Sequence, residues 1–248
     1  MPLKDDIDRQ MWLENEKFLS TVPGANYLTD PRIPLNDKYY LRHRIETIRR
    51  IRMTARTDAL ALASLVREDY EGSRFWARYT ADELCHDLLF SKDLAEHGVT
   101  KEMILGIPPF PSTLEMLRFL ESGIERDGAL PALVYSLFVE WNSMRFSGKA
   151  VRKVEKHYSG LHVRGSSAHL HIDESEDHYS KVLGIVEPIV QSRPRRVLLE
   201  NLIGDIASFF RAYFHELYAE TCEESRVPVK FHVKVEPEPA CLRPFPTN

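Results

Sequence analysis

The sequence predicts an all-α protein with a single folded domain. Three observations favour this class. Apolar residues recur with helical periodicity in several long stretches, prolines and glycines separate these stretches, and a chain of 248 residues with 43% hydrophobic residues can fill one large core. Within the domain we expect an N-terminal helix and loop over 1–36, a helical body over 37–226 and an extended C-terminal tail over 227–248.

Helical periodicity and chain breakers place the elements in order. Pro23 and Gly24 end the first helix, a proline-rich run interrupts the chain at 107–111, and Gly128 follows another helix end. The expected helices cover 4–20, 37–53, 55–70, 73–97, 112–126, 129–141, 167–190 and 195–224. The stretch 129–141 is almost wholly apolar and predicts a central buried helix.

Charge and composition exclude several classes of function. The net charge of −4 gives no basic surplus for nucleic acid. The longest apolar stretch, 129–139, is too short to span a bilayer, and the acidic N-terminus does not resemble a signal peptide. Three widely spaced cysteines fit free thiols better than disulfides. We therefore expect a soluble cytoplasmic protein that contacts neither nucleic acid nor membrane.

The stretch 169–178, HLHIDESEDH, predicts a metal-binding face. On a helix, His171, Glu174 and His178 fall at i, i+3 and i+7, so that two imidazoles and a carboxylate leave the same face. Iron, manganese and zinc accept such donors. Asp173 is an alternative acid, and an exposed polar helix without metal would show the same pattern.

Two earlier helices carry further candidate ligands. Glu83 and His86 form a Glu-x-x-His pair on one helical face, although Glu83 could instead close a capping box that begins at Thr80. Glu140 is a single carboxylate in an apolar helix, where it must lie near the wet end, form a salt bridge or bind a metal. Together with the 169–178 stretch, these residues supply enough donors for two first-row metals.

The helix 37–53 has an arginine-rich face. Such a face is usually solvated, but Arg42, Arg49 or Arg50 could instead turn inward and dock an anionic substrate.

In these motifs the chain resembles the haem-oxygenase-like dimetal oxidases, over roughly residues 40–220. The resemblance depends on Glu83 with His86, on Glu140, and on the His/acid/His helix, and is greatest to the branch of undecene-forming fatty-acid decarboxylases. That branch takes a further ligand from an earlier helix, and Glu46 is the carboxylate that matches it. Many members have an Asp where this chain has Ser175.

The resemblance implies a seven-helix bundle that binds Fe(II), two ions per chain, and uses O2 as co-substrate. It implies oxidation of a small carboxylic or amino acid by decarboxylation, C–C cleavage or N-oxygenation, in natural-product biosynthesis. The partners are then a small-molecule substrate and an external electron donor, and a homodimer is compatible with this interpretation. The alternative is a cofactor-free or thiaminase-like enzyme of the same fold, in which paired acids or a cysteine carry out the reaction. Cys85 beside His86 is the candidate nucleophile.

Overall fold

The computed structural model describes residues 3–223, apart from the side chains of residues 173–176. The expected C-terminal tail, 227–248, lies outside the described residues. In the described part of the chain every regular element is a helix, which confirms the all-α class. None of these helices is long and apolar enough to cross a membrane.

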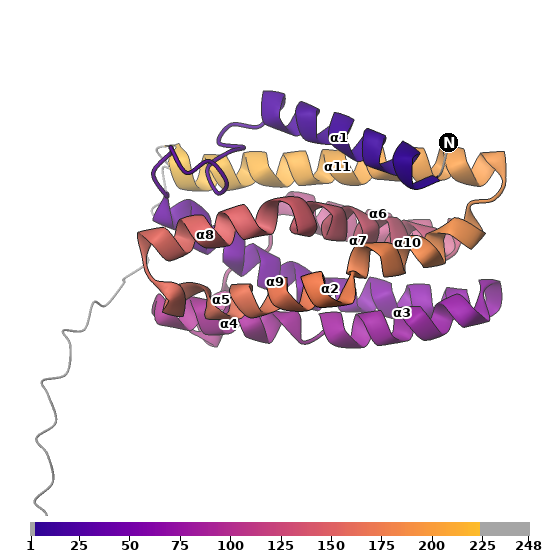
Figure 1. The fold of residues 1–248 in the computed structure, drawn as a ribbon, viewed down its shortest axis with the longest axis horizontal. Helices are drawn as coiled ribbons and strands as arrows, with labels where there is room; N and C mark the ends of the chain where they lie inside the picture. Colours follow the sequence, from indigo (N-terminus) through magenta and orange to yellow (C-terminus); the bar gives the residue numbers. More distant parts are fainter. Residues whose placement is uncertain (1–2, 224–248) are drawn as a thin grey trace, which may run out of the picture.

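From α2 onwards the helices follow one another with short connections, whereas a longer segment, 22–36, joins α1 to α2 (Figure 1). They are α1 (Leu3–Thr21), α2 (Asp37–Glu68), α3 (Tyr70–Glu83), α4 (His86–Glu96), α5 (Lys101–Gly106), α6 (Pro111–Asp127), α7 (Leu130–Asn142), the π-helical turn η1 (Ser143–Ser147), α8 (Gly148–His157), the 3-10 turn η2 (Gly160–Val163), α9 (Arg164–Glu176), α10 (His178–Ile189) and α11 (Arg193–Cys222).

The core forms around α7, as its apolar sequence predicts. Leu133, Leu137 and Trp141 on this helix are completely buried against residues of α3, α6, α10 and α11. Helix α1 lies along α11 (Figure 1). Asp8 of α1 accepts hydrogen bonds from Trp141 Nε1 at 2.9 Å and from the Tyr179 hydroxyl at 2.8 Å, so α1 is tied to both α7 and α10.

Residues 37–68 form one helix of 32 residues, α2, where the sequence predicted separate helices over 37–53 and 55–70. The side chain of Asn36 caps its first turn by accepting a hydrogen bond from the backbone N–H of Tyr39 at 3.1 Å. The apolar stripe of this helix, which includes Ile45, Ile48 and Leu65, is completely buried. One face of α2 therefore passes through the interior along the length of the bundle.

The expected helix 73–97 is interrupted after Glu83. The backbone N–H of Cys85 bonds to the carbonyl of Asp82 at 3.1 Å, an i→i+3 bond that tightens the chain into a turn. A new helix, α4, begins at His86. Glu83 is therefore the last residue of one helix and His86 the first residue of the next.

The expected helix 167–190 is also interrupted, at Asp177. This residue has φ 48° in the left-handed region, which Asp tolerates better than most residues. Its side chain caps α10 by accepting a hydrogen bond from the backbone N–H of Ser180 at 3.2 Å. The prediction of one continuous helix is wrong here, and with it the i, i+3, i+7 geometry expected for residues 171, 174 and 178.

Candidate metal centre

Five side chains from five helices converge in the interior. Glu83 ends α3, His86 begins α4, Glu140 lies on α7, His169 on α9 and His178 at the start of α10. They form two groups: Glu83 with His86 and His169, and Glu83 with Glu140 and His178. Within each group the ligand atoms all lie within 4.8 Å of one another. Glu83 belongs to both groups, so its carboxylate stands between them.

The first group is built on the turn between α3 and α4. His86 Nδ1 lies 2.9 Å from Glu83 Oε2. The rings of His86 and His169 are 4.2 Å apart between centroids, and Phe90 stacks against His169 at 5.0 Å. His86 is buried, whereas Glu83 and His169 are partly exposed. Packing of α9 on α4 thus brings a second imidazole to the Glu83 carboxylate.

The second group is deeper in the bundle. His178 Nδ1 lies 3.4 Å from Glu83 Oε1 and 3.9 Å from Glu140 Oε1. The Tyr79 hydroxyl donates a hydrogen bond to Glu140 Oε1 at 2.8 Å, and its ring meets the ring of His178 edge-on at 5.5 Å. Glu140 and His178 are both buried. Tyr79 therefore orients the Glu140 carboxylate from the side.

The electrostatics of the centre keep the Glu83 carboxylate available as a ligand. Burial disfavours the charged form of Glu83, yet its contacts with His178 and His86 hold its pKa below the usual range. Burial and the charge of Glu140 raise the pKa of Tyr79 well above its usual value, so Tyr79 remains a hydrogen-bond donor. Glu83 Oε1 is buried and makes no hydrogen bond of normal geometry with the described residues.

These features fit a pair of first-row metal ions. Two carboxylates and three imidazoles are hard and borderline donors without thiolate, as iron and manganese prefer. A carboxylate has two oxygens and can bridge two ions, which is the position that Glu83 occupies between the groups.

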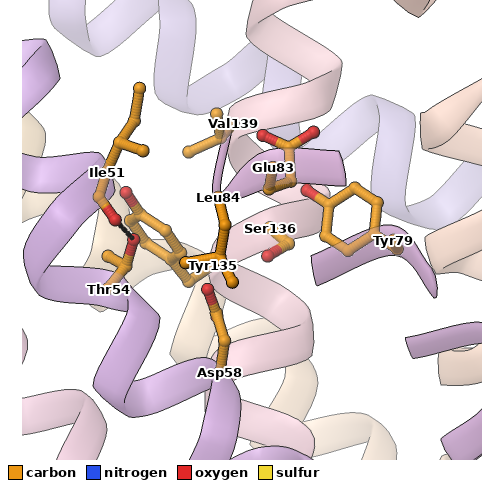
Figure 2. A pocket seen from close by; sticks show the side chains of 9 residues that line it. All are labelled: Ile51, Thr54, Asp58, Tyr79, Glu83, Leu84, Tyr135, Ser136 and Val139. Carbon is orange, nitrogen blue, oxygen red and sulfur yellow. Dashed lines mark hydrogen bonds between the residues drawn. The ribbon is translucent and has the colours of Figure 1, made fainter. Parts of the chain in front are cut away.

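A sixth polar residue, Asp58 of α2, lies beside the centre. It lines a cavity of about 50 Å³ together with Glu83, Tyr79 and Tyr135 (Figure 2). Burial and the charge of Glu83 raise the pKa of Asp58 to about 7. The sequence did not single out this residue, which lies four residues after the buried Thr54 on α2 and is partly exposed.

The structure brings together only some of the candidate ligands that the sequence suggested. Glu83, His86, Glu140 and His178 converge. His171 is exposed and belongs to neither group, because the break at Asp177 removes its alignment with His178. The side chains of residues 173 and 174, the two alternative acids, lie outside the described residues.

Glu46 lies outside both groups, whereas Arg42 and Arg50 on the same helix are buried, which is the inward placement that the sequence left open. Glu46 is fully buried, but it accepts hydrogen bonds from Arg42 Nη1 at 2.8 Å and from the backbone N–H of Phe110 at 3.1 Å and lies in neither group. Arg49 donates to the carbonyl of Leu105, and Arg50 is buried.

The thiol of Cys85 is exposed, whereas the neighbouring His86 is buried and in contact with Glu83. The described residues show no contact that would let His86 activate this thiol.

Comparison with solved structures identifies the fold. The chain is similar to a domain of unknown function with a heme oxygenase-like fold from Shewanella denitrificans, with a TM-score of 0.74, 15% identity and coverage of 87% of this chain and 92% of that one. A TenA homolog from Pseudomonas syringae pv. tomato matches with a TM-score of 0.65, 14% identity and coverage of 87% and 92%. A CADD-like protein of unknown function from Nostoc punctiforme matches with a TM-score of 0.61 and 14% identity. The match covers 87% of this chain and 98% of that one.

No family model matches the sequence, and no curated protein matches it significantly. At this level of identity the structural matches establish the fold alone. The chain thus has the haem-oxygenase-like, all-helical fold that the sequence predicts.

The two neighbouring histidines of α9 provide a matched test of the centre. His169→Ala removes an imidazole that faces Glu83 and His86, and we expect metal affinity to fall by at least about tenfold. His171→Ala removes an exposed imidazole two residues away, and we expect unchanged affinity. Metal titration of both variants, with circular dichroism to verify folding, measures the difference. Equal losses in both variants, or a loss only in His171→Ala, would contradict this geometry.

Asp58 predicts a specific pH dependence in the metal-free protein. The folded state holds the proton of Asp58 up to about pH 7, whereas an unfolded aspartate releases it near the ordinary value of 3.8. Ionisation of Asp58 therefore removes stability as pH rises through this window. The free energy of unfolding of Asp58→Asn, minus that of wild type, should increase between about pH 4 and 7. Urea denaturation at several pH values measures this difference, and a pH-independent difference would refute the prediction.

Proposed function

We propose that this protein is a nonhaem dimetal oxidase, a diiron enzyme that uses O2 to oxidise a small carboxylic or amino acid. The observation that carries the proposal is the position of Glu83, whose carboxylate is shared by two His/carboxylate groups inside the bundle. A structural ion pair needs only one imidazole beside a carboxylate. Here imidazoles from three helices and a second carboxylate surround the Glu83 carboxylate.

The ligand assignment follows the two groups. His86, His169 and Glu83 would hold one ion, and Glu140, His178 and Glu83 would hold the other. When bound, ferrous ions supply the electrons that reduce O2 while the substrate is oxidised, and an external reductant restores them. Relative to the sequence-based ligand set, His169 takes the place of His171.

Other residues of the chain prepare the site. Tyr79 fixes the orientation of Glu140, as outer partners of metal ligands commonly do. Ile51 and Val139 give the adjacent cavity apolar walls, which limit the access of water to the reacting groups. The Asp58 carboxyl group retains its proton close to neutral pH and can donate it within the cavity.

Anaerobic loading with Fe(II) tests the proposal. We expect about two iron ions per folded chain, measured by elemental analysis after removal of free metal. Glu83→Gln should lose most of both ions because it removes the shared ligand, and Glu140→Gln should lose roughly one. Asp82→Asn is the matched control, since it changes an exposed carboxylate next to Glu83 and should keep both ions. O2 consumption on addition of small carboxylic and amino acids then tests the oxidase activity.

Folding must be checked for each variant by circular dichroism and thermal denaturation. A folded wild-type protein that takes up neither iron nor manganese above background would overturn the proposal. Full iron content in Glu83→Gln would show that the ions bind elsewhere.

A further inference from the structure

The three arginines that the sequence analysis singled out on α2 have different surroundings. Arg42 is neutralised, because its guanidinium lies 2.8 Å from Glu46 Oε2 and 3.0 Å from Glu220 Oε1. Arg49 is partly exposed and donates to the backbone carbonyl of Leu105 at 3.2 Å. Arg50 is nine-tenths buried, and the described residues offer it no carboxylate within ion-pair distance.

Aromatic groups surround Arg50 in place of a carboxylate. Its guanidinium carbon lies 4.9 Å from the ring centroid of Phe210 and 5.5 Å from that of Tyr213, and Tyr135 interacts with it through its hydroxyl. These contacts and the longer-range attraction of Glu46 offset part of the cost of burying a guanidinium. Among the described residues, Arg50 therefore has no carboxylate in direct contact.

The groups next to Arg50 on α2 are a neutral histidine and an acid that is already paired. Burial and the nearby Arg44, Arg50 and Arg42 lower the pKa of His43 well below its usual value, so this imidazole stays neutral. His43 Nδ1 is engaged by the Tyr213 hydroxyl. Glu46, the nearest acid on the helix, already pairs with Arg42 and with the backbone of Phe110. An anion that entered here would meet Arg50 as a cation that has no carboxylate within ion-pair distance among the described residues.

Tyr135 connects Arg50 to the candidate metal centre. Its side chain lines the cavity that also contains Glu83, and Ile51 and Thr54, which follow Arg50 on α2, line the same cavity (Figure 2). Burial raises the pKa of Tyr135, so its hydroxyl remains a donor. A guanidinium and a phenol are both suited to a carboxylate, which accepts two charge-assisted hydrogen bonds.

We propose that Arg50 anchors the carboxylate of the substrate on the Tyr135 side of this cavity, where the Tyr135 side chain lines the cavity and its hydroxyl interacts with the guanidinium. The inference deepens the proposed function and rests on it for the identity of the reaction. The carboxylate binds to the guanidinium, the apolar body of the substrate lies against Ile51 and Val139, and the reacting carbon points towards Glu83. The cavity of about 50 Å³ favours small monocarboxylates.

Binding to metal-free protein tests this anchor separately from the metal centre. The probes are aliphatic monocarboxylates from acetate to octanoate and the corresponding primary amides, measured by calorimetry and thermal shift. We expect at least one acid to bind about tenfold or more tightly than its amide. Arg50→Gln should abolish this preference, Arg50→Lys should retain part of it, and Tyr135→Phe should weaken it severalfold. Arg49→Gln is the control and should bind like wild type.

A structural role for Arg50 gives a different pattern. If the guanidinium only supports the fold, Arg50→Gln lowers the thermal midpoint and leaves the preference for acid over amide intact, which overturns the proposal. Equal binding of acids and amides by wild type also overturns it. Because no metal is present, a protein that binds iron but shows no preference for acids refutes the anchor alone. A protein that prefers acids but binds no iron refutes the metal centre alone.

Discussion

The other features of the centre depend on the contacts between the Glu83 carboxylate and the imidazoles around it. A carboxylate that is largely removed from water costs several kcal/mol unless positive charge or hydrogen-bond donors surround it. Here His86 and His178 approach its two oxygens from α4 and α10. The helices must therefore be arranged so that imidazoles from separate segments reach one carboxylate, and metal ions would complete the compensation.

Two helix breaks produce this arrangement. The turn after Glu83 separates α3 from α4, and the left-handed backbone at Asp177 separates α9 from α10. In a continuous helix, the direction of the His178 side chain would be fixed relative to that of His171. The break at Asp177 removes this constraint, so α9 places His169 and α10 places His178 in the centre independently. Backbone irregularity of this kind is concentrated at sites where ligand geometry, and not local propensity, determines the conformation.

The sequence allows the helical fold and part of the centre to be predicted, for identifiable reasons. The almost wholly apolar composition of 129–141 identifies α7, and the Glu-x-x-His spacing identifies Glu83 and His86, which remain in contact although the helix breaks between them. His169 could not be found by the same reasoning, because its selection over His171 depends on the position of the break and on the packing of α9 against α4. The position of Asp58 beside the centre could not be inferred, because a single acid in an amphipathic helix is common.

The distribution of charge along α2 shows why an arginine-rich face can contain both structural and functional side chains. Arg42 and Arg50 lie on the same buried face, yet the first meets two carboxylates and the second meets aromatic rings and a phenol. Stability alone favours a carboxylate partner for every buried cation, because the desolvation cost of an unpaired cation exceeds the stabilisation from cation–π contacts. Under our proposal, the carboxylate of a ligand supplies the direct anionic partner that Arg50 lacks among the described residues.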